Sequence, residues 1–386
     1  MGKKITAFAV AVMIAFTTVF AGGFSDAVYA AGKDTVSAEA QYIDGATGGT
    51  VKVKTEYSDK FFAGSAKKEN AGLRKLSVLA ASAVYDEKFA GELMKFCGFT
   101  FEYENVTVTK EDNDHVSYAI GHKKIGDSTV IAVWVKGTSA DYEWISNFNL
   151  GNTPDHEGFS IAEEELDVKV ENYLVDHKIK DGTKYWITGH SRGAAVANLL
   201  AKRKTDEYGQ ANVYAYTFAT PRVSTKAKKK GYENIRNYIN PGDFVTEVAP
   251  AAWGYGRYGK DYVMTASAKK SMQKKFKKLT GEKYAGFDKK EMKKLLKAFM
   301  TYTGEDIQSY YTERDNGVAP ATFCKDGLAA YLAGDAKAYL YLLYVSGTDA
   351  DASAILESMN SDDGSQDGFA HAHSPSTYIA WIETMK

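Results

Sequence analysis

The sequence has little cysteine, little net charge and no long apolar run beyond its N-terminus. Cys97 and Cys324 are the only two cysteines among 386 residues. They could pair in an exported protein or remain as buried thiols, and neither is placed like a nucleophile. After residue 30, no segment is long and apolar enough to cross a bilayer. The formal net charge is −1 at neutral pH, which argues against a nucleic-acid partner.

The first 30 residues have the pattern of a secretory signal peptide. Lys3 and Lys4 give a basic start, residues 5–21 are apolar without a charge, and residues 28–30 end on small side chains that suit signal peptidase. We expect cleavage after Ala30 or the following alanine, which leaves no cysteine near the new N-terminus for lipid modification. An uncleaved membrane anchor is the competing interpretation. Removing residues 1–30 takes away two lysines and one aspartate, so the net charge moves from −1 to −2.

Apolar spacing predicts helices and strands that alternate along the chain. Strands alternating with helices indicate a mostly parallel sheet covered on both faces. Residues 31–60 are polar and are expected to form a loosely held arm with a strand near residues 51–53. The expected helices lie within 71–99 (two of them), at 160–177 and from 194 onward, and the expected strands at 101–108, 115–120, 130–135, 185–188, 213–219 and 235–239.

One short stretch, Gly189-His190-Ser191-Arg192-Gly193, is the most informative for function. It follows an apolar run at 185–188 and precedes a helical run that begins at Ala194. That strand–turn–helix context is what a G-x-S-x-G nucleophile elbow requires. Both glycines suit a turn in which a side chain would crowd the strand or the helix. The sequence therefore predicts Ser191 as an exposed nucleophile on a strained corner.

A serine hydroxyl needs a base to take its proton and a carboxylate to orient that base. In α/β-hydrolases the acid and then the histidine follow the serine along the chain. Of the seven histidines, only His371 and His373 therefore remain as candidates. For the acid we expect Asp243, which follows the predicted strand 235–239 on the rim where α/β sheets place their sites. Glu247 is the nearby competitor, and a turn-forming role is the alternative for Asp243.

The oxyanion of ester hydrolysis needs two preorganised N–H donors. One would come from Arg192, the residue after the nucleophile. Residues 133–138 are predicted to form a strand ending in a Gly-Thr turn, where Thr138 could present the second N–H. By itself, such a turn is more typical of an ordinary strand-to-loop connection.

Five segments lie in order along the chain: residues 135–138 before Trp144, His156-Glu157-Gly158-Phe159, residues 189–193, residues 218–223 and the loop with Asp243. Together they resemble the successive signatures of class 3 lipases, which are α/β-hydrolases of the fungal-lipase type. The resemblance implies an α/β-hydrolase fold, with Ser191 as nucleophile, Asp243 as orienting acid and a histidine near the end as base. It also implies Thr138 and Arg192 as oxyanion donors and an ester substrate, acylglycerol or phospholipid.

The sequence departs from the family pattern at two places. Lys136 stands where the family usually has arginine, and Arg192-Gly193-Ala194 where it has Leu-Gly-Gly. We expect the charged side chain beside the nucleophile to restrict or redirect the choice of substrate. Between the two histidines we prefer His373, which is followed by Ser-Pro at the start of a predicted C-terminal helix, and His371 remains the alternative.

A long insertion is predicted between the acid and the base. Only residues 147–155 separate the Gly-Thr region from His156, too few for the helical lid that fungal members carry there. Residues 251–367 are instead mostly helical and lysine-rich, and we expect them to cap the rim of the sheet. Twelve lysines between Lys269 and Lys297, against three acids, could attract an anionic lipid surface. A solvated helix face is the simpler explanation.

The expected organisation is a signal peptide at 1–30, an α/β-hydrolase core at 31–250, a helical cap at 251–367 and a closing core segment at 368–386. The function predicted for it is that of a secreted serine hydrolase, a lipase or esterase acting through an acyl-enzyme with no cofactor and no metal. A phospholipase or small-ester carboxylesterase is the second enzymatic possibility. A non-catalytic surface binding protein with a hydrolase fold is the alternative from another class. Nothing in the sequence indicates an oligomeric state.

Overall fold

The computed structural model describes residues 35–109, 114–139, 146–147, 153–180, 182–249, 251, 254–288, 290, 292 and 366–385. The expected signal peptide, most of the expected cap and Cys324 lie outside these residues. Within the described ranges, no helix combines the length and the apolar character that a membrane span needs.

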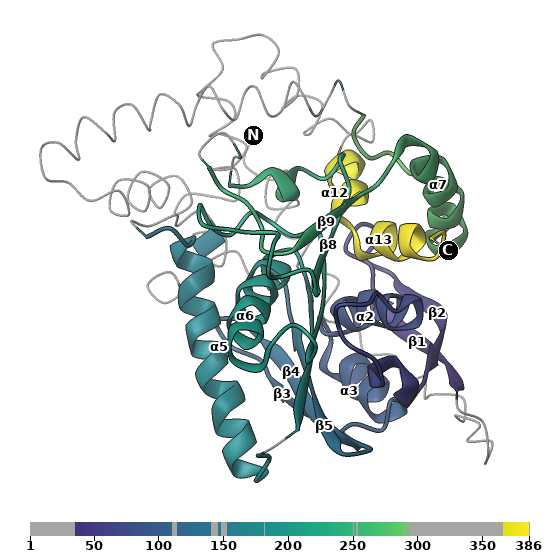
Figure 1. Cartoon of the computed structure of the whole chain (residues 1–386). Helices are drawn as coiled ribbons and strands as arrows, with labels where there is room; N and C mark the ends of the chain where they lie inside the picture. Colours follow the sequence, from purple (N-terminus) through teal and green to yellow (C-terminus); the bar gives the residue numbers. More distant parts are fainter. Residues whose placement is uncertain are drawn as a thin grey trace, which may run out of the picture.

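Seven strands form one sheet, in the order β3-β4-β5-β6-β7-β8-β9 (Figure 1). The pairs β3–β4 and β4–β5 are antiparallel, and the pairs from β5 to β9 are parallel. The mostly parallel sheet predicted from the sequence is thus confirmed. The strands are β3 (Glu102–Glu104), β4 (Tyr118–Ile125), β5 (Ser128–Val135), β6 (Thr183–His190), β7 (Val213–Phe218), β8 (Ile235–Ile239) and β9 (Lys260–Val263).

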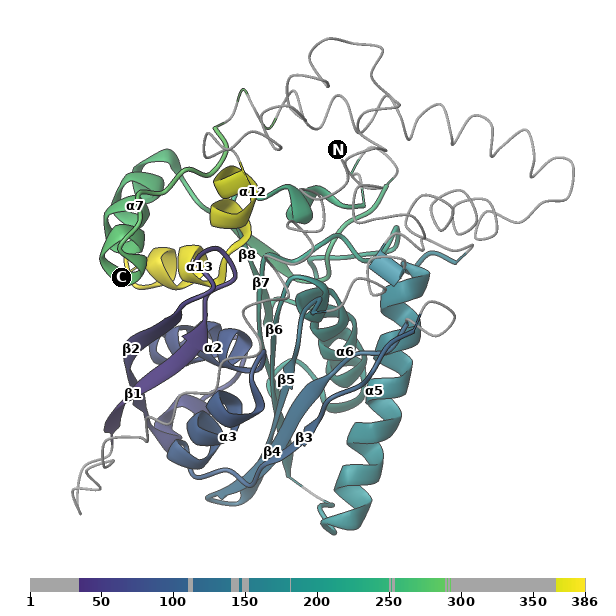
Figure 2. The ribbon, with the colours of Figure 1, turned by 180° about the vertical axis from the view of Figure 1, so that it is seen from behind.

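Side chains of the central strands alternate between two helical layers, because successive residues of a strand point to opposite faces. Trp186 of β6 belongs to one apolar cluster, and its neighbours Tyr185 and Ile187 belong to the other. This double burial explains the continuous apolar strands. As Figures 1 and 2 show, α5 (Glu157–Asp176) and α6 (Arg192–Tyr208) cover one face, and α2 (Ala71–Ala83) and α3 (Glu87–Phe96) cover the other.

The N-terminal segment packs against the core. β1 (Val36–Ile43) and β2 (Thr50–Tyr57) form an antiparallel hairpin, and every second residue of β2 is buried. Beyond β1, the buried carboxylate of Asp44 accepts a hydrogen bond from the hydroxyl of Ser374, near the other end of the chain. The expectation of a loosely held arm is therefore wrong, whereas the strand expected near residues 51–53 is confirmed as part of β2. The alternating apolar residues of β2 provide the buried face that holds the hairpin in place.

The last described helices return to the sheet from the insertion. α12 (Gln366–His373) is followed at once by α13 (Pro375–Ile382). Ser374 caps α13 with its side chain and Pro375 is the first helical residue, where a missing N–H costs nothing. α7 (Ala266–Thr280) packs against α13. Because β9 pairs with β8, the sheet continues past residue 250, the expected end of the core.

Candidate active site

Ser191 lies on the tight turn between β6 and α6. Its φ of +59° and ψ of −132° are rare for a residue with a side chain, and such strain clusters at functional sites. The two motif glycines leave no room for a Cβ. One on Gly189 would collide with the carbonyl of Gly193, and one on Gly193 with the carbonyl of Val135. The strand–turn–helix corner predicted from the sequence is confirmed, with the reason for both glycines. The expectation that Ser191 is exposed is wrong, because the residue is 5% exposed.

Three predicted site residues meet at this turn. The Oγ of Ser191 is 2.8 Å from Nε2 of His373, and Nδ1 of His373 is 3.0 Å from Oδ2 of Asp243. With a carboxylate at Nδ1, that nitrogen carries the proton, so Nε2 is left to accept the serine hydroxyl. The arrangement has the connectivity that activates a serine nucleophile.

The carboxylate of Asp243 is fully buried and is held by two further donors. Tyr378 donates its hydroxyl to Oδ2 at 2.6 Å, and the N–H of Val245 donates to Oδ1 at 3.0 Å. Burial and the adjacent carboxylate raise the pKa of Tyr378 well above its ordinary value, so its hydroxyl stays a donor. Asp243 thus caps its own turn and contacts His373 as well. The competitor Glu247 is paired instead with Arg222, at 2.6 Å.

His371 lies on a different side of α12. Residues two apart on a helix are separated by roughly 200° around its axis. Nδ1 of His371 accepts the N–H of Ala285 at 3.0 Å, and Nε2 lies 3.1 Å from the carboxylate of Glu282. The side chain is 2% exposed. The structure therefore places His373, and not His371, beside Ser191.

His190 contacts the backbone of His373, the candidate base, and Tyr85 contacts His190. Nε2 of His190 is 2.8 Å from the carbonyl oxygen of His373, and Nδ1 is 3.0 Å from the hydroxyl of Tyr85. Burial lowers the pKa of His190 well below its ordinary value. The neutral ring therefore donates from Nε2 to that carbonyl and accepts from the tyrosine. Sequence reasoning missed Tyr85, because no motif marks this residue between α2 and α3.

Thr138 and Arg192 lie on either side of the elbow. In the pairing of β5 with β6, Val135 is opposite Gly189, so Thr138 follows β5 next to the turn. Its Oγ1 accepts a hydrogen bond from Nδ2 of Asn147 at 2.9 Å. Arg192 is the first residue of α6, where backbone N–H groups have no acceptor within the helix.

The side chain of Arg192 points into the protein. Arg192 is 1% exposed. Its guanidinium donates to the hydroxyl of Ser146 at 2.7 Å and to Oδ1 of Asn147 at 3.2 Å. The guanidinium is therefore buried against the protein's own polar groups, and its effect on the choice of substrate stays a prediction.

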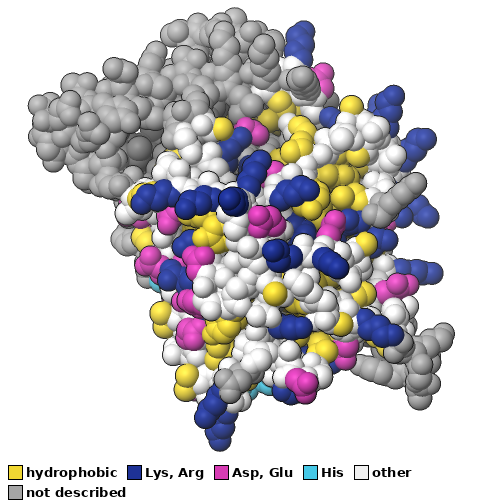
Figure 3. Space-filling model, viewed as in Figure 1, with side chains coloured by type: hydrophobic (Ala, Val, Ile, Leu, Met, Phe, Trp, Pro, Cys, Tyr) yellow, Lys and Arg dark blue, Asp and Glu magenta, His cyan; other side chains and the backbone are white. Residues whose placement is uncertain are grey.

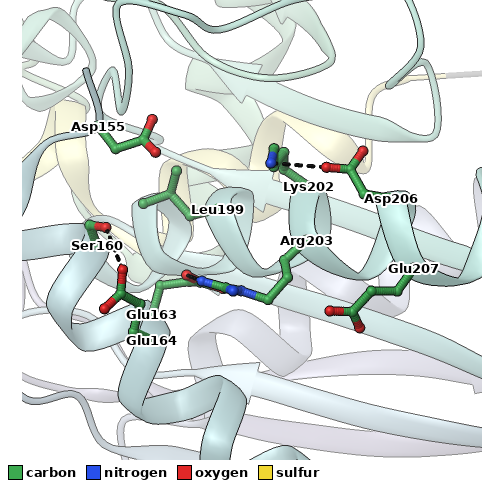
Figure 4. Close-up of a pocket in the computed structure, with 9 residues that line it drawn as sticks. All are labelled: Asp155, Ser160, Glu163, Glu164, Leu199, Lys202, Arg203, Asp206 and Glu207. Atoms are coloured by element: carbon green, nitrogen blue, oxygen red, sulfur yellow. Dashed lines mark hydrogen bonds and ion pairs between the residues drawn. The ribbon is translucent and has the colours of Figure 1, made fainter. Parts of the chain in front are cut away.

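A hollow between α5 and α6 is separate from this site (Figure 4). None of the nine residues that line it is a predicted site residue. Its charges pair with one another, as in the contacts of Glu163 with Arg203 at 2.7 Å and of Lys202 with Asp206 at 2.9 Å. In the part of the chain that the structure describes, no group of three or more His, Cys, Asp or Glu side chains is arranged to hold a metal ion.

Part of this chain resembles known proteins. Residues 132–253 match the family model described as Lipase (class 3), a range that includes Ser191 and Asp243 and ends before His373. Toxin TseL of Vibrio cholerae is 34% identical over 118 residues, which are 30% of this chain and 18% of that protein. A lipase from Rhizomucor miehei is 27% identical over 165 residues, 38% of this chain and 46% of that protein.

A solved structure of the Rhizomucor miehei triacylglyceride lipase matches 51% of this chain and 80% of its own, with 21% identity and a TM-score of 0.39. The chain spans less than half the length of the two relatives matched by sequence.

Proposed function

Because the chain belongs to the class 3 lipase family and has an α/β-hydrolase fold, we propose that it is a secreted serine hydrolase that cleaves carboxylic esters of lipids. The observation that carries the proposal is the hydrogen-bonded series from Ser191 through His373 to Asp243. Export would remove residues 1–30. A mature chain that begins at Ala31 or the next residue, measured by mass spectrometry of exported protein, would support this, and a retained N-terminus would contradict it.

In the proposed reaction, Oγ of Ser191 attacks the ester carbonyl carbon while Nε2 of His373 takes the hydroxyl proton. The carbonyl oxygen becomes an oxyanion, which accepts hydrogen bonds from the N–H groups of Thr138 and Arg192. Asp243 stabilises the imidazolium. The alcohol leaves with the proton from His373, and the acyl group stays on the serine. Water then attacks this acyl-enzyme with the same histidine as base, and the carboxylic acid is released.

The test is to treat the folded protein lacking residues 1–30 with a fluorophosphonate probe and a panel of esters. We expect a covalent adduct on the peptide that contains Ser191, located by mass spectrometry. Hydrolysis of p-nitrophenyl esters of short and long acyl chains, a triacylglycerol and a phospholipid would separate lipase, phospholipase and carboxylesterase activity. A folded protein that forms no adduct and hydrolyses none of the esters would favour the non-catalytic binding protein instead.

The insertion 251–367 is proposed as a cap, and its lysines as a contact with anionic lipid. Four lysines of α7 are exposed, at positions 270, 274, 277 and 278, and basic side chains lie over the side of the molecule where α7 packs (Figure 3). Each lysine near an anionic surface contributes about 1 kcal/mol. We expect phosphatidylcholine vesicles to cosediment with the protein only when they contain anionic lipid, and less so after Lys→Gln changes at these four positions. Equal binding to vesicles with and without anionic lipid would contradict the lipid contact and favour a solvated helix face.

A further inference from the structure

We propose that the guanidinium of Arg192 positions the oxyanion hole, an inference that rests on the proposed ester hydrolysis. The backbone N–H of this residue is already the expected donor on the elbow side. Its side chain extends to the segment that holds the second expected donor, Thr138. Arg192 would therefore supply one N–H donor of the oxyanion hole and position the other, that of Thr138.

The guanidinium contacts three separate parts of the chain. Besides its bonds to Ser146 and Asn147, its Nη2 donates to the carbonyl oxygens of His115 at 3.2 Å and Gly158 at 3.4 Å. The acceptors come from the segment before β4, from the 146–147 pair and from the first turn of α5. A planar group with five N–H donors in a fixed fork can join such acceptors in one geometry.

Asn147 connects the guanidinium of Arg192 to Thr138, the second expected oxyanion donor. Its Oδ1 accepts from Arg192 at 3.2 Å, so the amide must direct Nδ2 the other way, where it donates to Oγ1 of Thr138 at 2.9 Å. The guanidinium thus determines which end of the amide meets Thr138. Because catalytic donors must lie within a few tenths of an ångström of their productive positions, a rotated amide would move the Thr138 N–H away from the developing oxyanion.

The 146–147 pair is also held from its other sides. Nε2 of His156 donates to the carbonyl oxygen of Asn147 at 3.1 Å, and burial lowers the pKa of this histidine to about 3, so the ring stays neutral. The hydroxyl of Ser146 donates to the carbonyl oxygen of Gly158 at 3.1 Å. The carbonyl of Asn147 and the hydroxyl of Ser146 therefore have partners other than Arg192, and what Arg192 adds is the orientation of the Asn147 amide.

Other residues at position 192 cannot supply these contacts. Leucine, which the family usually has there, carries no donor and would leave buried acceptors in three segments without this partner. Lysine keeps the charge but concentrates its donors on a single nitrogen, which cannot reach acceptors in all three segments. Arg192→Lys is therefore the most specific test, because it retains the positive charge and a similar side-chain length and removes only the branched guanidinium donors.

The experiment compares Arg192→Lys with Asn147→Ala and with Arg236→Lys as a matched control. Arg236 is also a buried arginine, but it donates to the carbonyls of residues 234, 66 and 67, away from the elbow. We expect kcat for p-nitrophenyl esters to fall about 10- to 100-fold in Arg192→Lys and in Asn147→Ala, with KM little changed, because an oxyanion contact forms in the transition state. Arg236→Lys should lower Tm and leave kcat unchanged.

The double variant Arg192→Lys/Asn147→Ala separates a role through Asn147 from a general one. If Arg192 acts through that amide, the double variant loses no more kcat than the worse single variant. Wild-type kcat in folded Arg192→Lys, or equal losses of kcat in Arg192→Lys and Arg236→Lys, would overturn the inference while leaving the proposed function intact. A wild-type protein that hydrolyses no ester would overturn both. If Arg192→Lys does not fold, wild-type kcat in Asn147→Ala would by itself overturn the inference.

Discussion

Ser191→Ala is expected to lower kcat/KM for ester hydrolysis by about 10⁵- to 10⁶-fold, the loss that follows removal of the nucleophile from a serine hydrolase. The variant retains the elbow but lacks the oxygen that lies 2.8 Å from Nε2 of His373. Alanine has the same difficulty as serine with the φ of +59° at this position, so we expect the free energy of unfolding to change by less than about 1 kcal/mol. Kinetics and thermal unfolding on the same preparation measure both quantities.

A serine elsewhere provides the control for Ser191→Ala. Ser160 lies on α5 and contacts Glu164 within the same helix, so Ser160→Ala should keep the wild-type rate. Activity above about 1% of wild type in purified Ser191→Ala would contradict the assignment of this serine as nucleophile, since the oxyanion hole and substrate binding alone give a far smaller residual rate.

The elbow and the sheet were predictable because their signals are local. Two glycines at fixed spacing around Ser191, between an apolar strand and a helix, already describe a corner with no room for side chains. The strand periodicity likewise gave β7 and β8 within a residue of their ends. In both cases the steric requirement acts on neighbouring residues, so it is visible in the sequence.

The environment of Arg192 could not be predicted in the same way. Its acceptors lie 34 to 77 positions away along the chain, and no local pattern marks the segments that hold them. A charged residue beside a nucleophile therefore suggested an effect on the substrate. The buried acceptors, which only the folded chain brings together, explain why the guanidinium turns inward instead. The N-terminal hairpin was misjudged for a related reason, since Asp44 contacts Ser374 across 330 positions.

For the two histidines near the C-terminus, the sequence narrows the candidates for the base and only the structure distinguishes between them. Chain order reduced seven histidines to His371 and His373, but both lie in the same short helix and differ by two positions. Their side chains point in different directions, and which of them points to Ser191 depends on how α12 lies over the sheet. His373 ends the helix beside the elbow, and His371 faces the segment that follows α7.

His373→Ala is therefore expected to lose activity, and His371→Ala to lose stability. Loss of His373 removes the group that takes the proton of Ser191, so kcat should fall about 10⁵- to 10⁶-fold and fluorophosphonate labelling should disappear. Loss of the buried His371 ring leaves the backbone N–H of Ala285 and the carboxylate of Glu282 without their present partner. We expect it to lower the free energy of unfolding by about 1 to 3 kcal/mol and to keep kcat within about threefold of wild type, because it contacts no member of the proposed triad.

Measuring both variants below the Tm of the less stable one separates these effects. Removing either histidine can destabilise the fold, since His373 also partners the buried carboxylate of Asp243, so a loss of activity counts only in protein that circular dichroism shows to be folded. A folded His371→Ala variant that loses labelling while His373→Ala retains it would reverse the assignment of the base. Equal loss in both would contradict the division between them, because α12 would then act only as a unit that holds the elbow.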